Sequence, residues 1–115
     1  MVCRVWRGWT TVENAQSYDD YLQKELFPRL ERDISKLGYR GYQLLRLARE
    51  EEVEFMTMLW FDSLDHVRCF AGEHYEVPVI SEKARSLLLR YANRADHFEL
   101  RGSRQLESSG MEIVP

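Results

Sequence analysis

The sequence predicts a single α+β domain with the order strand, helix, two strands, helices, strand. Runs rich in aromatic and β-branched residues lie at 2–11, 39–49, 53–61 and 95–101, and apolar residues repeat at three- and four-residue steps in the segments after the first and third runs. A chain of 115 residues with 44% hydrophobic residues suits one core. We place the domain at 1–102 and expect a flexible tail, rich in serine and glycine, at 103–115.

The first strand and the first helix are adjacent along the chain. Apolar and aromatic residues alternate loosely with polar ones from Val2 to Thr11, which is typical of a strand. Asn14 can cap a long amphipathic helix whose apolar residues recur from Tyr18 to Leu37, and Gly38 is expected to end it.

A proline interrupts this helix. Pro28 has no N–H to donate to the carbonyl of Lys24. We therefore expect a kink or a local break near Phe27.

The second and third strands form a predicted hairpin. The runs Tyr39–Arg49 and Val53–Phe61 are separated by the acidic triplet 50–52, which suits a solvated tip. The third run is apolar at both parities, so both faces of the sheet are expected to be apolar. One face would carry Val53, Phe55, Leu59 and Phe61, and the other Met56, Met58 and Trp60.

Two helices and a strand are expected to complete the domain. The segment 62–65 offers capping residues for a short helix that ends near Gly72, and Ser81 can cap a further helix. That helix would carry the apolar stripe Ala84, Leu87, Leu88 and Tyr91. Residues 95–101 then predict the fourth strand.

This order of elements suits the ferredoxin-like arrangement, a four-stranded antiparallel sheet with helices on one face. Strands one and three would be central, and strand four would lie beside strand one. The other face would expose more apolar surface than a monomer usually shows to water. We therefore predict a homodimer that forms through this sheet face.

Composition argues against several classes of protein. The net charge of -3 offers no basic surface for nucleic acid, and no apolar run is long enough to cross a membrane. Cys3 and Cys69 lack a CxxC spacing, which favours reduced, buried thiols and a cytoplasmic location. The three histidines show no metal-ligand spacing and no nucleotide-binding motif occurs, so we expect no metal and no cofactor.

Four short motifs, in order, resemble the antibiotic biosynthesis monooxygenase-like domains, over roughly residues 2 to 101. They are Trp6-Arg7-Gly8-Trp9-Thr10, Gly38-Tyr39-Arg40-Gly41-Tyr42, Thr57-Met58-Leu59-Trp60-Phe61-Asp62-Ser63 and Phe70-Ala71-Gly72-Glu73. The resemblance implies a dimeric α/β barrel with a pocket in each protomer between sheet and helices. Some members of the family oxygenate electron-rich phenols without a metal or organic cofactor, and others degrade haem. The residues that the haem-degrading branch uses are missing here: the first strand has no Asn, and Cys69 and Val79 stand at the expected Trp and His positions.

The resemblance thus implies a cofactor-independent monooxygenase acting on a small aromatic or quinol compound, with a non-catalytic, ligand-binding or accessory dimeric barrel as the alternative. Such oxygenation needs a base, donors that hold an anion and a dry cavity. His74 and His97 are the candidate catalytic residues. The candidate substrate-binding residues are Trp6, Trp9, Trp60 and Tyr75.

Each candidate also has a structural explanation. The histidines could be hydrogen-bonded structural residues, and the tryptophans could pack in the core or the dimer interface. Arg7 and Arg46 could hold an anionic ligand if they face inward, or form salt links at the surface.

Overall fold

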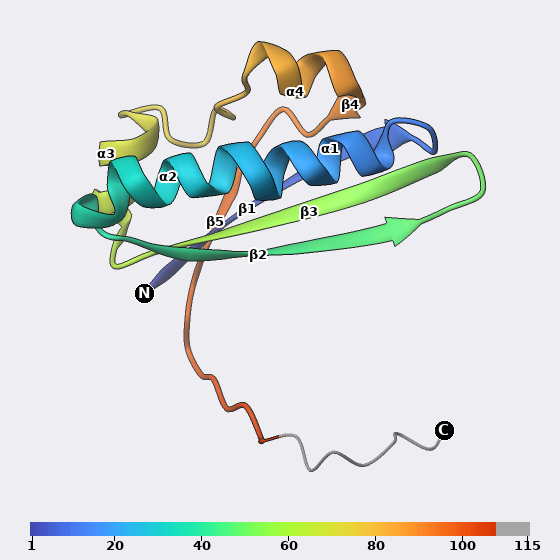
Figure 1. Ribbon diagram of the computed structural model, residues 1–115. Helices are drawn as coiled ribbons and strands as arrows, with labels where there is room; N and C mark the ends of the chain where they lie inside the picture. Colours follow the sequence, from blue (N-terminus) through green and yellow to red (C-terminus); the bar gives the residue numbers. More distant parts are fainter. Residues whose placement is uncertain (108–115) are drawn as a thin grey trace.

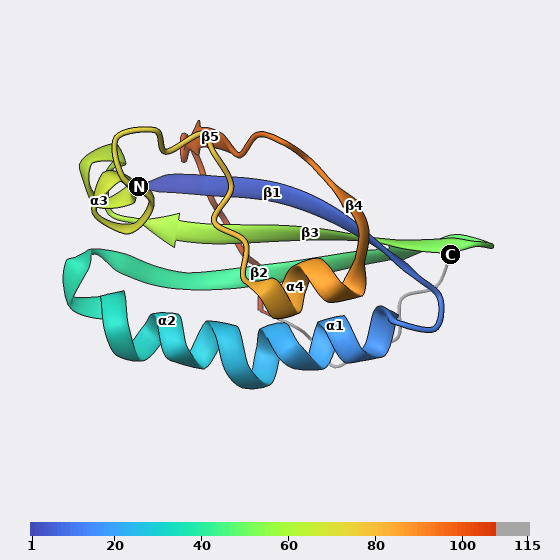
Figure 2. The same ribbon diagram turned by 90° about the horizontal axis from the view of Figure 1, so that it is seen from above.

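The sheet is built around two long central strands, β1 (Val2–Thr11) and β3 (Glu52–Phe61), which pair antiparallel over their whole length. β2 (Tyr39–Ala48) pairs with the outer edge of β3, and the strand order is β2-β3-β1-β4. The computed structural model describes residues 1–107. The helices lie on one face of the sheet (Figures 1 and 2).

One long helical rod covers that face. It consists of α1 (Ala15–Tyr21), a wide π-helical turn (η1, Leu22–Leu26), α2 (Phe27–Ile34) and a final 3-10 turn (η2, Ser35–Leu37). Asn14 precedes the rod, but its side chain donates to the carbonyl of Leu87 at 3.4 Å and makes no capping bond. Asn14 thus occupies the predicted N-cap position, but its backbone is helical (φ -88°, ψ -9°) instead of extended, and its side-chain oxygen makes no capping bond.

The irregularity expected near Phe27 takes the form of the π turn. The N–H of Phe27 donates to the carbonyl of Leu22, five residues back, and Pro28 occupies the first turn of α2, where no N–H is needed. The i→i+5 hydrogen bond of a π turn closes a wider loop than the i→i+4 bond of an α-helix, so the turn accommodates one extra residue. The wide turn therefore keeps Tyr18 and Leu22 in phase with Phe27 and Leu30, and all four are buried.

Gly38 ends the rod, as predicted. Its φ of 90° is left-handed, and a Cβ there would lie 2.3 Å from the ring of His66. Its carbonyl accepts from the N–H of Asp62 at 2.9 Å. Only glycine fits this turn without strain, because α3 packs against it.

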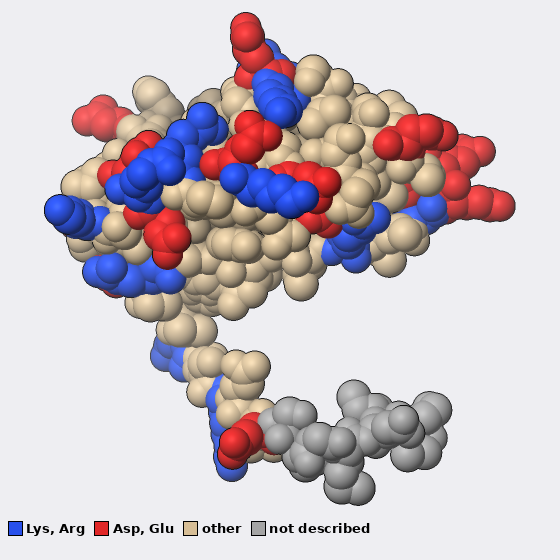
Figure 3. Space-filling view, in the orientation of Figure 1, with Lys and Arg blue, Asp and Glu red and all other residues tan. Residues whose placement is uncertain are grey.

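The hairpin forms where the sequence predicts it. Along β3 buried and partly exposed residues alternate, and Val53, Phe55, Thr57, Leu59 and Phe61 face the helices. Met56, Met58 and Trp60 lie on the opposite, open face of the sheet. Acidic side chains gather at the end of the molecule where Figure 1 places the β2–β3 hairpin (Figure 3).

Two short helices follow β3. α3 (Leu64–Ala71) begins at Ser63, whose hydroxyl accepts from the N–H of His66 at 3.4 Å. α4 (Glu82–Leu87) begins at Ser81, whose hydroxyl accepts from the N–H of Ala84 at 3.1 Å. Both serines sit where the sequence places helix starts.

The last part of the domain corrects the prediction. Leu88–Tyr91, expected to continue the helix, is strand β4, and the fourth strand at 95–101 is the short β5 (Asp96–Glu99). Both pair with the same edge of β1, β4 near Trp9 and β5 near Cys3. The helix stops because the free backbone groups at the edge of β1 offer hydrogen bonds to this segment, and this tertiary pairing overrides the helical spacing of its apolar residues.

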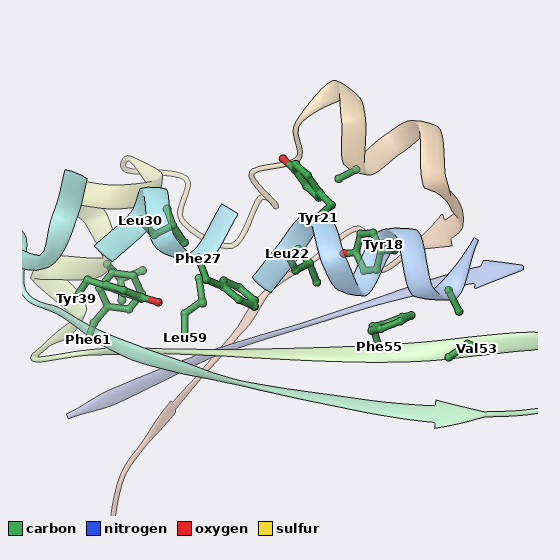
Figure 4. Close-up of a cluster of buried hydrophobic side chains, with 13 residues drawn as sticks. Tyr18, Tyr21, Leu22, Phe27, Leu30, Tyr39, Val53, Phe55, Leu59 and Phe61 are labelled. Atoms are coloured by element: carbon green, nitrogen blue, oxygen red, sulfur yellow. The ribbon is translucent and has the colours of Figure 1, made fainter. Parts of the chain in front are cut away.

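The chain thus has the predicted ferredoxin-like α+β fold, with the edge strand divided in two. Its core lies between the rod and the sheet, where Tyr18, Phe27, Phe55 and Phe61 are almost fully buried (Figure 4). Residues 100–107 run away from the sheet with no helix or strand, and 108–115 of the expected tail lie outside the described residues. None of the helices in the described part of the chain is long and apolar enough to cross a membrane.

Candidate functional site

A cavity of about 320 Å³ lies between the sheet and the helical layer. Trp6 of β1 and Thr57 and Leu59 of β3 line it from the sheet, and Leu22 and Phe27 line it from the rod, on either side of the π turn. Figure 4 shows Leu22 and Phe27 pointing from the rod toward the strands, with Leu59 below. The cavity therefore lies between the sheet and the helical rod, beside the π turn.

The remaining wall comes from the segment after β3. Phe70 of α3, the loop 78–81 and Ala84 of α4 close the cavity opposite the rod. Most of the lining side chains are aliphatic or aromatic. Small-molecule sites in proteins usually have volumes of about 300 to 1,000 Å³, so this cavity is at the small end of that range. Size and lining suit a small aromatic compound.

Arg4 supplies the buried charge at this cavity. Arg4 is only 4% exposed. It lies on the helix-facing side of β1 and pairs with Leu59 of β3. The guanidinium donates to the carbonyl oxygens of Tyr75 and Val77, the latter at 3.2 Å. It also lies 5.6 Å from the centre of the Phe70 ring. Burial lowers the pKa of Arg4 to about 10, so it stays a cation at neutral pH.

His97 is hydrogen-bonded to the guanidinium of Arg4. Its Nε2 lies 3.0 Å from Nη1 of Arg4, and β5 places the two residues directly opposite each other. Since arginine has no acceptor, Nε2 accepts and the proton of the neutral ring is on Nδ1. The Tyr75 ring packs edge-on against the imidazole at 5.0 Å between centroids. Burial, and next the charge of Arg4, lower the pKa of His97.

This lowered pKa predicts a pH dependence of stability. Below about pH 6.5 the unfolded chain takes up a proton at His97 more readily than the folded protein does, so the free energy of unfolding falls as pH falls. His97→Gln should therefore lose less stability than the wild type between pH 7.5 and about 5.5, as measured by urea unfolding. His74→Gln removes an exposed histidine and is the control; equal slopes for His97→Gln and wild type would contradict the prediction.

The other predicted site residues separate into two groups. Trp6 lines the cavity, and its indole N–H donates to the carbonyl of Ala92 at 2.7 Å. Tyr75 and His97 lie beside it, behind Arg4, along an open depression at the β5 edge. The structure therefore brings Trp6, Tyr75 and His97 together around Arg4.

Trp9 and Trp60 lie on the open face of the sheet. The indole N–H of Trp9 donates to Glu54 at 3.3 Å, and the guanidinium of Arg90 covers its ring at 4.7 Å. Trp60 donates to Gln43 and lines a groove of about 300 Å³ beside Met58. Neither indole lines the cavity between sheet and helices.

His74 also lies apart from the cavity. It is exposed in the loop after α3, and its carbonyl accepts from the N–H of Val77 at 3.0 Å. Arg7 is exposed beside Glu54 at 3.9 Å, and Arg46 pairs with Asp19 at 3.0 Å. Both arginines make the salt links that the sequence left as one option.

Sequence reasoning missed Arg4. Its signal was strand parity, because Arg4 shares the phase of Trp6, Gly8 and Thr10, the residues of β1 that face the helices. Charged residues are almost never fully buried unless they are paired, so a charged residue at a buried strand position is an informative observation.

Potential metal ligands and two thiols occur in residues 1–107. No group of three His, Cys, Asp or Glu side chains in this range could hold a metal ion. Cys3 is buried, as expected, and burial raises its pKa to about 11. Cys69 is exposed on α3, so the expectation of two buried thiols is wrong for this residue.

Known structures share this architecture. No protein-family model and no curated protein sequence matches the chain. A solved structure of a candidate antibiotic biosynthesis monooxygenase from Bacillus cereus has a TM-score of 0.62 and 8% identity, covering 94% of this chain and 98% of that one. The chain therefore has the antibiotic biosynthesis monooxygenase-like fold. The haem degrader MhuD from Mycobacterium tuberculosis, with two haems in its active site, has a TM-score of 0.54 and 15% identity, covering 91% and 100%.

Proposed function

We propose that this protein is a cofactor-independent oxygenase that takes a small aromatic or quinol compound into the cavity between sheet and helices. The cavity itself supports this proposal: it holds about 320 Å³ and is lined by Trp6, Phe27 and Phe70 among other apolar side chains. Aromatic walls suit a flat ring, and an apolar site excludes the water that would stabilise charge in bulk solution. A solved structure of the same fold that is described as a candidate monooxygenase also supports it.

The proposed chemistry uses only substrate and oxygen. An ionised phenol or anthrone passes one electron to O₂, and the resulting carbon radical and superoxide combine and take up a proton to form a hydroperoxide. Loss of water from the hydroperoxide leaves a new carbonyl group. The substrate carbon is oxidised, one oxygen atom enters the product and the other leaves as water.

We also propose that the functional unit is a homodimer. The open face of the sheet carries Leu45, Leu47 and Phe98, which are 52%, 53% and 56% exposed, beside Met58 and Trp60. A sheet face with this many exposed apolar side chains is typical of a surface that another protein covers. A second copy of the same face is the simplest partner, because it matches in size and in apolar character.

Oxygen uptake tests the proposed reaction. With hydroquinones and anthrones, wild type should consume oxygen faster than the uncatalysed reaction. Ala84→Phe should abolish the excess, because Ala84 is 5% exposed and lines the cavity. Ala48→Phe adds the same ring at the exposed end of β2 and should keep the rate.

The same assay tests the two histidines. His97→Ala should lower the rate, because Arg4 loses an acceptor, and His74→Ala should not, because that side chain lies outside the cavity. The absence of uptake with every substrate would exclude the oxygenase.

One observation favours the second candidate, a binding protein without turnover. Within residues 1–107, no histidine and no carboxylate lines the cavity, so its lining lacks the side chains that most often act as general bases. Quenching of tryptophan fluorescence by an aromatic ligand, without oxygen uptake, would identify this function.

A further inference from the structure

The polar end of the cavity has an unusual charge balance. Arg4 is buried and lines the cavity, and Arg29 lines it from α2, where it is exposed. Within the described part of the chain, no acidic side chain lines the cavity, and Arg4 has no carboxylate within ion-pair distance. The chain as a whole carries a net charge of -3, so this positive site runs against the overall charge.

Burial of a lone cation is costly, and the neighbours of Arg4 compensate it only in part. Its three hydrogen bonds go to two carbonyl oxygens and to the neutral ring of His97. These acceptors are dipoles, whereas buried charges are usually paired with an opposite charge. An anion entering the cavity would supply the missing charge.

The guanidinium also has free donors. Arginine has five N–H groups, and three are used in these contacts. The two others, on Nε and Nη2, have no acceptor among residues 1–107. Two neighbouring N–H groups of this kind bind a carboxylate in two-pronged fashion or a single anionic oxygen.

We propose that Arg4 binds the ligand as its anion, so that the compound in the cavity is an aromatic molecule with an ionised oxygen, phenolate or carboxylate, directed at Arg4. This inference rests on the small-molecule function proposed above. It also gives the site a way to ionise a phenol without a protein base: Arg4 stabilises the phenolate, and water at the cavity mouth accepts the proton. His97 and Tyr75 are positioning residues, because they touch Arg4.

Matched ligand pairs test the inference on the wild-type protein. 4-Nitro-1-naphthol changes colour when it ionises, and its methyl ether has nearly the same shape but cannot ionise. Below the pKa of the free phenol, adding wild type should convert the phenol to its coloured, ionised form. Above that pKa the phenol should bind about tenfold to a hundredfold more tightly than the ether, by tryptophan quenching. 2-Naphthoate and 2-naphthamide form the carboxylate pair. Whichever anion binds more tightly, the phenolate or the carboxylate, identifies the ionised group that Arg4 recognises.

Variants then assign the effect to Arg4. Arg4→Met should remove both the colour change and the preference for the anion, whereas Arg4→Lys should keep part of both. Arg32→Met removes a cation from the same helix as Arg29, where its side chain is 70% exposed, and should leave both unchanged. If Arg4→Met does not fold, the wild-type ligand pairs still decide whether the cavity selects anions, and Arg4→Lys assigns the effect to Arg4.

Two outcomes would overturn the inference in different ways. Equal affinity for phenol and ether, with no colour change, means that an aromatic site exists but does not select anions. No quenching by any of the four compounds means that the proposed small-molecule function fails, and the inference with it.

Discussion

Gly38→Ala is expected to lower the free energy of unfolding by about 2–5 kcal/mol. A left-handed φ of 90° costs a residue with a Cβ roughly 1–2 kcal/mol. The new Cβ would also lie 2.3 Å from the imidazole of His66, and overpacking of this kind costs typically about 1–3 kcal/mol. Since small domains are stable by about 5–15 kcal/mol, much of the protein should unfold at moderate urea concentrations.

Two further variants separate strain from steric overlap. Gly72 also has a positive φ, 86°, but its ψ of -174° lies in a region that essentially only glycine adopts, and a Cβ there meets nothing within 4 Å, so Gly72→Ala should cost roughly 1–3 kcal/mol from backbone strain alone. His66→Ala combined with Gly38→Ala should cost less than the sum of the two single changes. Strictly additive losses for Gly38→Ala and His66→Ala would show that the imidazole moves aside without cost.

Met58→Asp is expected to convert the proposed homodimer to a monomer. Met58 lies on the open face of β3, between Val5 of β1 and Gln43 of β2. An unpaired carboxylate at the centre of an apolar interface costs several kcal/mol, so the dissociation constant should rise by about a hundredfold or more. Light scattering at micromolar concentration should then report 13.7 kDa instead of twice that mass.

Val12→Asp is the matched control for this variant. Val12 is 49% exposed in the turn before α1, away from the sheet face, and its replacement should leave the mass unchanged. A wild-type particle of 13.7 kDa at micromolar concentration would contradict the dimer itself.

The long elements could be predicted from sequence because local pattern and tertiary environment agree there. Alternation along β3 and the apolar repeat from Tyr18 to Leu37 both correspond to real faces of the domain. The helix capped by Ser81 was predicted too long, because the spacing of Leu87, Leu88 and Tyr91 fits a helix. Residues 88–91 form a strand because they pair with the edge of β1. A partner strand that is distant in sequence cannot be recognised from the residues of this segment alone.

The candidate site could be predicted less well than the fold. The motif around Trp6 correctly marked a strand that lines the cavity, but Trp9 lies three residues along that strand and faces away. The choice between the two faces of β3, which moves Trp60 out of the cavity, depends on where the helices pack. Arg4 escaped notice because the cost of burying its charge depends on the carbonyls of Tyr75 and Val77, more than seventy positions away.

The π turn gives this domain a particular route to new ligands. The turn uses more residues per revolution than a regular helix, and Leu22 and Phe27, at its two ends, both line the cavity. Loss of one residue between them would tighten the turn and rotate α2 about its own axis relative to α1. A single-codon deletion would thus exchange the side chains above the ligand while the strands beneath it kept their sequence, and relatives of this fold could diverge in specificity by changing helix length alone.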